Sequence, residues 1–463
     1  GAPGNRCRLS SRRGYRNPFQ RAFLVPVAEP QRVRDAVVTK FYVLQATRSV
    51  GFISPIFTLF LLRSLSFTEV GLLSALSAAV VVAGEVPTGY VGDRLGRRAS
   101  IGLSIGLKAV SLAGFVVAES FAAYAVLYLP WALGMTFASG SVDAWLYDTL
   151  EERLDAGAFT RVRGRGEAVL QWTSVVTAVG GGLLYTLAPT WPFVASVGLN
   201  VLGLAAVASL PANRAYREQS AAGPDARATI AVLRRAVATP SLRAFVLYVS
   251  LLFAVVSAST TYVQPVAEAL FAGAATPLPT DGSDTAAWLA TVFPTDIPVG
   301  VGLGLLYAAF SGISAVASQQ AGALEDRVGF PRLLAAVGVG TAVLLVLPRL
   351  ALLAALPLFV AQRVSRALLL PMVNARVSGA VADAGRATVL SAVSLLVRLW
   401  KLPLAVAAGV LADATGGGAA GSVSAVGETT ALAALGGLFL LVTLGVVVFV
   451  APVRRLVPNS GAG

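Results

Sequence analysis

The chain has 463 residues, of which 56% are hydrophobic and only 13% are charged, and its mean hydropathy is +0.75. A soluble protein of this length would expose far more charge, so the composition predicts a polytopic membrane protein. Because the sequence contains no histidine, it excludes histidine-dependent catalytic triads, HExxH zinc sites, axial histidine ligation of haem and histidine proton relays. Cys7 is the one cysteine and has no partner for an internal disulfide bond.

The N-terminal segment is rich in arginine and contains no continuous apolar run. We expect residues 1–38 to form a disordered cytoplasmic tail. From residue 39 onward, apolar stretches of about 20 residues recur, and each is long enough to cross ~30 Å of hydrocarbon. The sequence predicts twelve spans, at 39–63, 68–91, 99–118, 122–146, 165–188, 192–210, 241–268, 298–321, 331–348, 352–375, 388–411 and 429–451.

The basic residues of the predicted connections lie mostly on one side of the membrane. With the N-terminus inside, the opposite side carries only Arg63 and Arg349, and its longest connection, 269–297, is acidic. This asymmetry follows the positive-inside rule and predicts a multi-pass protein of the cytoplasmic membrane with both termini cytoplasmic. The formal net charge of +13 then reflects topology and contact with anionic lipid headgroups, and no nucleic-acid partner is expected.

A polar connection divides the predicted spans into two sets of six. The expected fold is an all-α membrane protein made of two six-helix bundles. The predicted organisation is an N-terminal bundle at 39–210, a cytoplasmic linker at 211–240, a C-terminal bundle at 241–451 and a cytoplasmic tail at 452–463.

A charged, glycine-rich stretch, GYVGDRLGRR at 89–98, connects the second and third spans, and a degenerate copy, GALEDRVGFPR at 322–332, connects the eighth and ninth. A duplication at equivalent positions indicates two homologous halves. A loop of the form G-x-x-x-D-R-x-G-R-R after the second of twelve spans resembles the signature of the major facilitator superfamily. The candidate gating residues are Gly89, Asp93, Arg94, Gly96, Arg97 and Arg98 in the first copy, and Asp326 and Arg327 in the second.

The resemblance covers about 39–455, which is nearly the whole chain outside the N-terminal tail. It implies two bundles related by a pseudo-two-fold axis along the membrane normal, with the substrate bound between them. It also implies that spans one, four, seven and ten line the central cavity, and that spans two, five, eight and eleven form the seam between the halves. The motif itself binds no substrate, so it indicates a transporter without indicating its cargo.

The glycines and the aspartate of the motif suggest a gate. Gly89 and Gly92 are expected to let the second helix end and pack closely on its neighbour, and Gly96 permits a tight reversal. The resemblance implies that Asp93 bridges the two halves on the cytoplasmic side and holds the outward-open state. The alternative is that the arginines of the motif only anchor the loop to headgroups.

Several cations fall inside predicted spans, where an ionisable side chain marks a functional site by default. Arg48 lies nine residues into the first span, ~14 Å deep at the rise of an α-helix. Arg363 and Arg366 are expected to share one face of the tenth span, and Arg398 and Lys401 one face of the eleventh. The four arginines are candidates for binding an anionic substrate group, because a guanidinium matches carboxylate and phosphate.

Structural roles for these cations stay open as alternatives. Arg48 would then pair with Asp143, Lys108 would reach a helix end, and Lys401 would snorkel or form a structural pair.

Three further polar side chains are weaker candidates for the cavity, since side chains of this kind in membrane helices more often pack or anchor. They are Gln171 on the fifth span, and Tyr262 and Gln264 on the seventh. The glycine run 180–182 on the fifth span is expected to pack closely on another helix.

Proton coupling requires a buried group that can exchange a proton. Asp143 on the fourth span and Glu85 on the second are the candidates. The alternatives are a structural role for Glu85 beside the gate and simple hydration of Asp143 near the cytoplasmic end. Sodium coupling stays open.

Taken as a transporter, the chain is expected to work as a monomer, with no cofactor, metal site or catalytic residue, and it contains no P-loop for ATP. We expect secondary transport of a small organic solute by alternating access, with proton-coupled export of a drug-like or metabolite compound preferred. Uptake of an organic anion is the alternative. Two alternatives belong to other functional classes: a transport-inactive sensor or scaffold, and a membrane enzyme. The intact gating motif argues against a transport-inactive protein.

Overall fold

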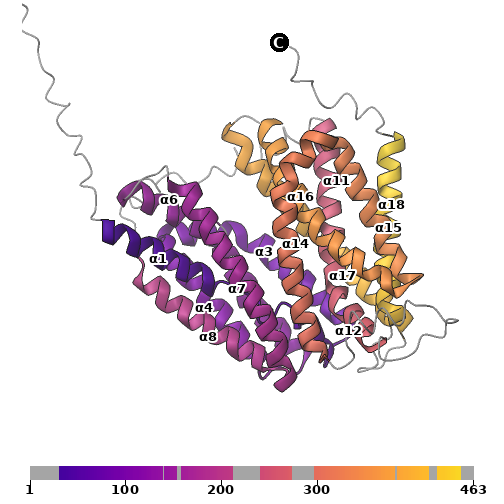
Figure 1. The fold of residues 1–463 in the computed structure, drawn as a ribbon, viewed down its shortest axis with the longest axis horizontal. Helices are drawn as coiled ribbons and strands as arrows, with labels where there is room; N and C mark the ends of the chain where they lie inside the picture. The colour runs from indigo at the N-terminus through magenta and orange to yellow at the C-terminus, as the bar shows by residue number, and fades with distance from the viewer. Residues whose placement is uncertain are drawn as a thin grey trace, which may run out of the picture.

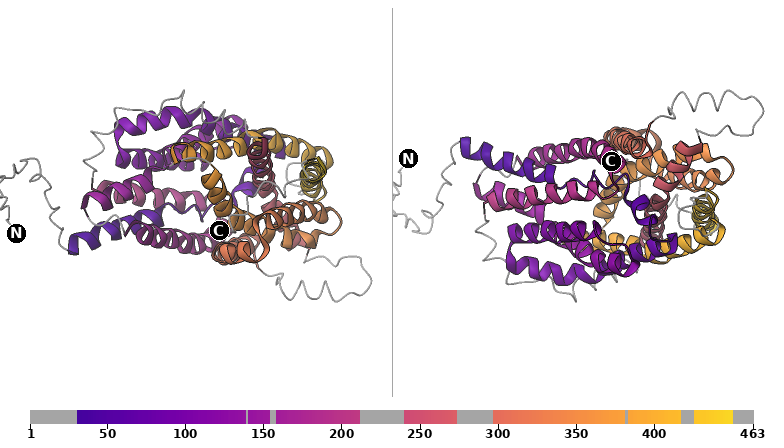
Figure 2. Two further views of the ribbon diagram at one scale, coloured as in Figure 1. Left: turned by 90° about the horizontal axis from the view of Figure 1, so that it is seen from above. Right: turned by 90° about the horizontal axis from the view of Figure 1, so that it is seen from below.

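The computed structural model describes residues 31–138, 140–153, 158–211, 240–273, 297–380, 383–416 and 425–449. Within these ranges every regular element is helical, as the sequence predicts, and the helices form two groups that follow each other in the chain (Figures 1 and 2). The predicted C-terminal tail and the interior of the predicted linker lie outside the described residues.

The N-terminal half contains the first six predicted spans. Its helices are α1 (Gln31–Thr47), α2 (Phe57–Leu62), α3 (Phe67–Leu95), α4 (Arg97–Phe115), α5 (Phe121–Ala138), α6 (Ser141–Arg153), α7 (Phe159–Leu187) and α8 (Trp191–Ser209). Helix α1 begins inside the predicted tail, because an α-helix can continue through polar residues beyond the hydrocarbon.

The C-terminal half contains the other six spans. Its elements are α11 (Pro240–Ser259), η3 (Thr260–Tyr262), α12 (Val263–Gly273), α14 (Val299–Val328), α15 (Phe330–Val346), η4 (Leu347–Arg349), η5 (Leu352–Ala354), α16 (Ala355–Ala380), α17 (Asp383–Gly416) and α18 (Ala425–Phe449).

Ten segments of the described chain are long and apolar enough to cross a membrane. The first and third predicted spans are not among them. The first is divided between α1 and α2, and the third corresponds to α4, whose hydropathy is lowered by Arg97, Arg98 and Lys108.

Three predicted spans are interrupted rather than continuous. The first is non-helical at residues 48–56, so Arg48 follows the end of α1 instead of lying within a helix. The fourth breaks at Gly140, whose φ of 72° ends the helical path between α5 and α6. The seventh changes into the short 3₁₀ helix η3 between α11 and α12. Hydropathy is uniform across such breaks, and for this reason the sequence pattern does not reveal them.

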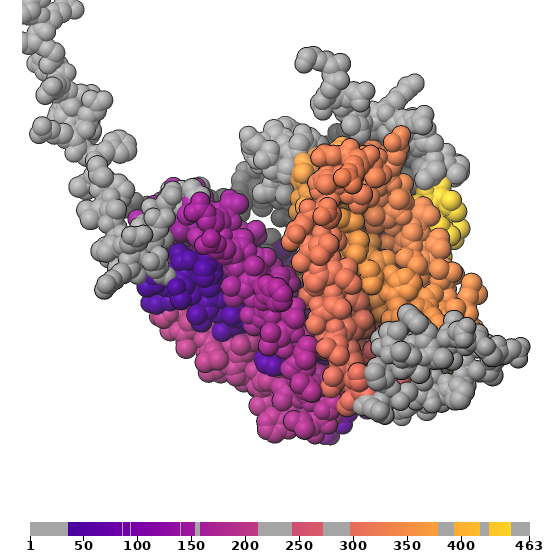
Figure 3. Space-filling model, viewed as in Figure 1, coloured from indigo at the N-terminus to yellow at the C-terminus, as the bar shows by residue number. Residues whose placement is uncertain are grey.

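The two halves touch mainly through α3 against α17 and α7 against α14. These are the second, eleventh, fifth and eighth spans, which is the seam that the resemblance implies. Figures 1 and 3 show the halves converging at one end of the molecule and diverging toward the other. We call the converging end, where α3 begins and α17 ends, the closed end, and the opposite end the open end.

Glycines make the contact at the closed end a contact between backbones. A Cβ atom added to Gly409 of α17 would lie 2.4 Å from the carbonyl oxygen of Phe67 at the start of α3. A Cβ on Gly182 of α7 would lie 2.1 Å from the carbonyl oxygen of Gly300 on α14. The predicted packing role of the glycine run on the fifth span is therefore confirmed, and the halves can approach this closely only while these positions lack side chains.

We predict that Gly409→Val disfavours closure of this end. Overpacking of this kind costs about 1–3 kcal/mol, which corresponds to a change of about fivefold to a hundredfold in the ratio of closed to open molecules. The same substitution at Gly340 is the matched control, because a Cβ atom added there would meet no other atom within 4 Å.

Spin labels at Arg63→Cys and Thr415→Cys, one on each half beside the closed end, measure this change in a Cys7→Ser background. The population of long distances should rise in Gly409→Val and stay at the wild-type level in Gly340→Val. Equal distance distributions in all three proteins would contradict the role given to Gly409.

Candidate functional site

A cavity of about 510 Å³ lies between the two halves. Its wall is built by α2, α3 and α5 from the N-terminal half and by α11, η3, α16 and α17 from the C-terminal half. It therefore includes the four spans that the resemblance implies, together with the second and eleventh. The volume is within the range of about 300–1,000 Å³ that is usual for pockets binding small molecules.

The C-terminal side of the cavity is basic. Arg366 of α16 and Arg398 and Lys401 of α17 all line it, and we call these three residues the basic cluster. Arg398 and Lys401 are three residues apart and so project from one helix face. No aspartate or glutamate is among the described residues that line the cavity. The sequence prediction thus included two members of the cluster among the substrate-binding candidates, whereas it considered for Lys401 only a structural alternative.

The N-terminal side of the same cavity is aromatic. Phe57, Tyr128 and Trp131 line it, and the Phe57 and Trp131 rings are stacked, with centroids 6.1 Å apart and planes 14° from parallel. Serines and threonines from both halves complete the wall. The cavity thus presents cations on one side and flat apolar surfaces on the other.

Arg363 does not line this cavity, although the sequence pattern places it on the same helix face as Arg366. Its guanidinium lies 5.2 Å from the ring centroids of both Tyr307 and Phe310 on α14. Cation–π contacts of this kind hold Arg363 inside the C-terminal half. The i,i+3 spacing covers a wide enough arc for one arginine to face the cavity and the other to face a neighbouring helix.

Gln264 joins the two halves and does not line the cavity. Its Oε1 accepts hydrogen bonds from the backbone N–H groups of Thr58 (2.6 Å) and Leu59 (3.3 Å) in the first turn of α2. Its Nε2 donates to the backbone oxygen of Ser54 (2.7 Å) and to the Tyr307 hydroxyl (3.1 Å). Because the first span is broken before α2, the backbone N–H groups of Thr58 and Leu59 and the backbone oxygen of Ser54 have no partners within a helix. The Gln264 side chain of the opposite half provides their hydrogen-bond partners.

Tyr262 also takes part in closure. Its ring is buried and stacks on Phe67 of the N-terminal half, with centroids 5.5 Å apart and planes at 24°. The neighbouring Thr261 lines the cavity in its place. Both candidates proposed for the seventh span therefore lie at the closed end, Tyr262 as the last residue of the 3₁₀ helix η3 and Gln264 just after it.

Asp413 near the end of α17 was missed by the sequence prediction. Its carboxylate accepts hydrogen bonds from the backbone N–H of Phe67 (3.0 Å), from the backbone N–H of Thr68 (2.8 Å) and from the Thr68 hydroxyl. It therefore caps the N-terminus of α3 from the other half, next to the Ser66–Glu69 capping box. Its position just before a glycine run gave no signal of such a role.

The two copies of the gating motif adopt matching backbone conformations at the open end. Gly96 ends α3 with φ 89° and ψ 157°, and Gly329 ends α14 with φ 83° and ψ 138°. A side chain is strongly disfavoured at such dihedral angles, so the reversal predicted at Gly96 is confirmed. Helix α3 continues past Gly89, which has no atom within 4 Å of a Cβ position, whereas Gly92 packs against Ser100. The expected helix end and close contact at Gly89 are therefore wrong.

The charged residues of the two motif copies make different contacts. Arg98 donates to the Ala208 backbone oxygen at the C-terminus of α8 (2.6 Å), and Arg94 lies over the Tyr90 ring. In the second copy, Glu325 pairs with Arg376 of α16 at 3.0 Å, while Asp326 and Arg327 are exposed. Arg97 lies in the first turn of α4. The side chain of Asp93 is outside the described residues, so its gating role stays a prediction.

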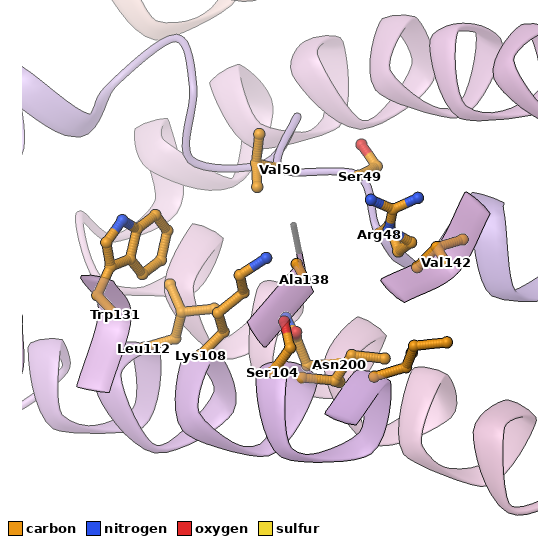
Figure 4. Close-up of a pocket in the computed structure, with 12 residues that line it drawn as sticks. Arg48, Ser49, Val50, Ser104, Lys108, Leu112, Trp131, Ala138, Val142 and Asn200 are labelled. Atoms are coloured by element: carbon orange, nitrogen blue, oxygen red, sulfur yellow. The ribbon is translucent and has the colours of Figure 1, made fainter. Parts of the chain in front are cut away.

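A second, much smaller cavity of about 20 Å³ lies inside the N-terminal half and contains Arg48 (Figure 4). It is separate from the central cavity, although Trp131 lines both. Arg48 donates to the Gln45 side-chain oxygen on the last turn of α1. The alternative pairing of Arg48 with Asp143 is not formed, because Asp143 pairs with Arg163 of α7 at 2.9 Å.

The predicted proton-coupling residues lie at the open end of the N-terminal half. The Asp143 carboxylate is about half exposed, at 46%, and is held by Arg163. Glu85 is half-buried on α3 and does not line the central cavity. Gln171, another cavity candidate, is exposed and donates to Glu167 on its own helix at 3.0 Å. None of these three lines the central cavity.

Glu428 is a buried acid that the sequence prediction left outside the last span. It lies in the first turn of α18 and is 1% exposed. Both of its carboxylate oxygens are buried, and within the described part of the chain no other residue donates a hydrogen bond to them. Glu268 of α12 and Tyr262 interact with it electrostatically, and Asp413 interacts with the same Tyr262. The boundary placed at residue 429 hid this carboxyl at the closed end.

Comparisons with known proteins place this geometry in a family. The family model described as Major Facilitator Superfamily matches residues 43–280, more than half of the chain. YxaM of Bacillus subtilis (strain 168), an uncharacterized MFS-type transporter, is 28% identical over 156 residues, which are 33% of this chain and 38% of that protein.

Two solved structures share the fold. The nucleoside transporter NupG has a TM-score of 0.69 and 11% identity, covering 90% of this chain and 98% of that one. A D-xylose–proton symporter has a TM-score of 0.60 and 14% identity, covering 93% of this chain and 99% of that one. The family model, the twelve-span fold and the duplicated gating loop agree, and the chain belongs to the major facilitator superfamily.

Proposed function

We propose that this protein is a secondary transporter that carries an organic anion across the membrane by alternating access. The observation that supports the proposal most is the basic cluster, because three cations line the central cavity and no acid is found among the described lining residues. Cations at this depth are costly unless a ligand or a partner compensates them. An anionic cargo provides that compensation, whereas a cationic drug-like cargo would add to the repulsion.

The aromatic wall opposite the cluster suggests what else the cargo contains. Phe57, Tyr128 and Trp131 offer flat apolar surfaces across the cavity from the guanidinium groups. A compound with a carboxylate or phosphate at one end and a planar or apolar body at the other would satisfy both walls. This favours the organic-anion alternative over the drug-like compounds that the sequence favours.

The membrane orientation follows from the charges of the two ends. The open end carries Arg94, Arg97 and Arg98 of the first motif copy and Arg327 of the second. By the positive-inside rule we place this end in the cytoplasm and the closed end outside. The structure then represents an inward-open state, in which the cavity is sealed from the exterior by Gln264, Asp413 and the glycine contacts.

Charge-removing substitutions in the basic cluster test the cargo class. Arg366→Gln or Arg398→Gln should weaken binding of the preferred anion about 10- to 100-fold, because each removes charge-assisted hydrogen bonds worth about 1.5–3 kcal/mol. The measurement is the stabilisation of purified protein against heat across a panel of organic anions, cations and neutral compounds.

Arg349→Gln changes an exposed arginine that does not line the cavity, so it is the matched control and should bind as the wild type does. If cations or neutral compounds stabilise the protein while anions do not, the proposed cargo class is wrong. Unchanged anion affinity in both cluster variants would equally exclude the cluster as the binding site.

We further propose that Glu428 carries the coupling proton, alongside the open-end candidates Asp143 and Glu85. A buried charge without partners is costly, whereas a protonated carboxyl is tolerated. Opening of the closed end would separate Phe67 from Tyr262, the ring that interacts electrostatically with Glu428, and would admit water to this acid. Glu428 would then bind a proton in the closed state and release it in the open state, with Glu268 and Asp413 as its ionisable neighbours.

The closed end should therefore open more often in mildly alkaline than in mildly acidic buffer. Loss of the proton charges Glu428, and the charge is hydrated only when this end is open. The distance between labels at Arg63→Cys and Thr415→Cys measures the effect. Glu428→Gln should abolish most of the pH response and stay predominantly closed.

Glu119→Gln, which neutralises an exposed acid, is the control and should respond as the wild type does. The same pH measurement on Asp143→Asn and Glu85→Gln shows whether one of these open-end acids, and not Glu428, causes the pH response. A full pH response in Glu428→Gln, or its loss in one of these two variants instead, would assign the coupling proton elsewhere.

A further inference from the structure

The small cavity inside the N-terminal half is a site distinct from the central cavity. It lies where α1 ends and is enclosed by α4, α5, α6 and α8. Its polar lining consists of Arg48, Ser49, Ser104, Lys108 and Asn200. Figure 4 shows the Lys108 ammonium and the Arg48 guanidinium projecting into the space between these helices from different sides.

Neither cation is neutralised within the cavity. Among the described lining residues there is no aspartate or glutamate. Within the described chain, the Lys108 ammonium makes no hydrogen bond or ion pair, and Arg48 uses one nitrogen to bond Gln45. Asp143, the acid next to the lining residue Val142, is held by Arg163 on α7. Two like charges therefore face one small space that no described acid lines, and the acids whose charges act on Arg48, Asp143 and Glu167, lie outside that lining. Such an arrangement is costly inside a protein.

The broken first span fixes this arrangement. The Ser49 hydroxyl bonds the hydroxyls of Ser174 (3.0 Å) and Thr177 (2.9 Å) on α7, and it accepts from the Gly51 backbone N–H (3.0 Å). Ser49, the second residue after the end of α1, is therefore anchored, and Arg48 beside it lines the cavity inside the N-terminal half.

We propose that this cavity binds one small inorganic anion of the halide type between Arg48 and Lys108. Its volume of about 20 Å³ exceeds the roughly 10–15 Å³ that a single water requires. It is far below the roughly 300 Å³ of pockets for organic ligands, so the organic cargo is excluded from it. Ser104 uses its hydroxyl donor on the Gly134 backbone oxygen, and Asn200 uses one of its two amide N–H donors on the Ser196 backbone oxygen, so the two cations are the charged ligands of the site.

The position of the site suggests how the anion affects the protein. Trp131 lines both cavities and stacks on Phe57 in the aromatic wall of the central one. An anion that holds Arg48 and Lys108 in place would stabilise α4 and α5 behind that wall. The site is a stabilising ligand site of the N-terminal half, and it does not depend on which cargo the central cavity binds.

Thermal unfolding of the purified full chain in detergent tests the proposal. At constant ionic strength, replacement of sodium gluconate by sodium bromide or chloride should raise the unfolding temperature in a saturable manner. Lys108→Gln, or Lys108→Met where the first variant is poorly folded in gluconate, should raise the half-saturating bromide concentration at least tenfold. Lys401→Gln is the control for the central cavity and should retain the wild-type halide response.

Crystals grown with bromide provide the second measurement, and an anomalous peak is expected between Arg48 and Lys108. The proposal is overturned by a lack of saturable stabilisation, by an unchanged response in the Lys108 variants, or by a response lost only in Lys401→Gln. A halide effect that disappears in Lys108→Gln while the basic-cluster variants show no anion preference would support this site and reject the organic-anion cargo.

Discussion

The first turns of two helices in the N-terminal half are capped by side chains of the C-terminal half, and this is the contact on which the observed conformation depends. Gln264 satisfies backbone groups at the start of α2, and Asp413 those at the start of α3. Helix N-termini have unpaired N–H groups that need partners. When the halves separate, water can replace both caps, and each hydrogen bond contributes only about 0.5–1.5 kcal/mol net. The closed end is held by these hydrogen bonds and by close backbone contacts at glycines. These contacts require a defined geometry, and each is weak enough for the two halves to separate again.

Features of the fold that depend on hydropathy or on a short sequence motif are predictable from the sequence. The spans follow from apolar length and the Gly96 reversal from the need for a positive φ, and both are local properties. The seam, in contrast, is what the resemblance to the major facilitator superfamily implies. Arg366 and Arg398 were found because a cation inside a span is conspicuous wherever it points. The direction in which such a side chain points is not predictable from residue spacing alone. Arg363, on the same helix as Arg366, faces the aromatic rings of α14 and not the cavity.

The rest depended on where helices break and on which segments meet. Residues 48–56 read as part of an apolar run, yet the chain leaves the helix there and directs Arg48 into the N-terminal half. Gln264 and Asp413 lie far from their partners in sequence, so their capping roles exist only in the folded protein. Glu428 was missed because the predicted span begins at residue 429 whereas α18 begins at Ala425, an error of the size that is common at helix ends.

The broken first and seventh spans connect these features physically. In each half the break lies next to a charged or polar site: Arg48 and the small cavity in one, and Tyr262, Gln264 and the buried Glu428 in the other. A continuous helix satisfies its own backbone and leaves little reason for such groups to be buried beside it, whereas a break exposes N–H and C=O groups that require polar neighbours. The backbone groups exposed by the first-span break bind Gln264 of the opposite half, so these hydrogen bonds can form only when the closed end is closed. Movement of the halves must therefore change the surroundings of the residues beside the seventh-span break, while the site beside the first-span break stays within one half.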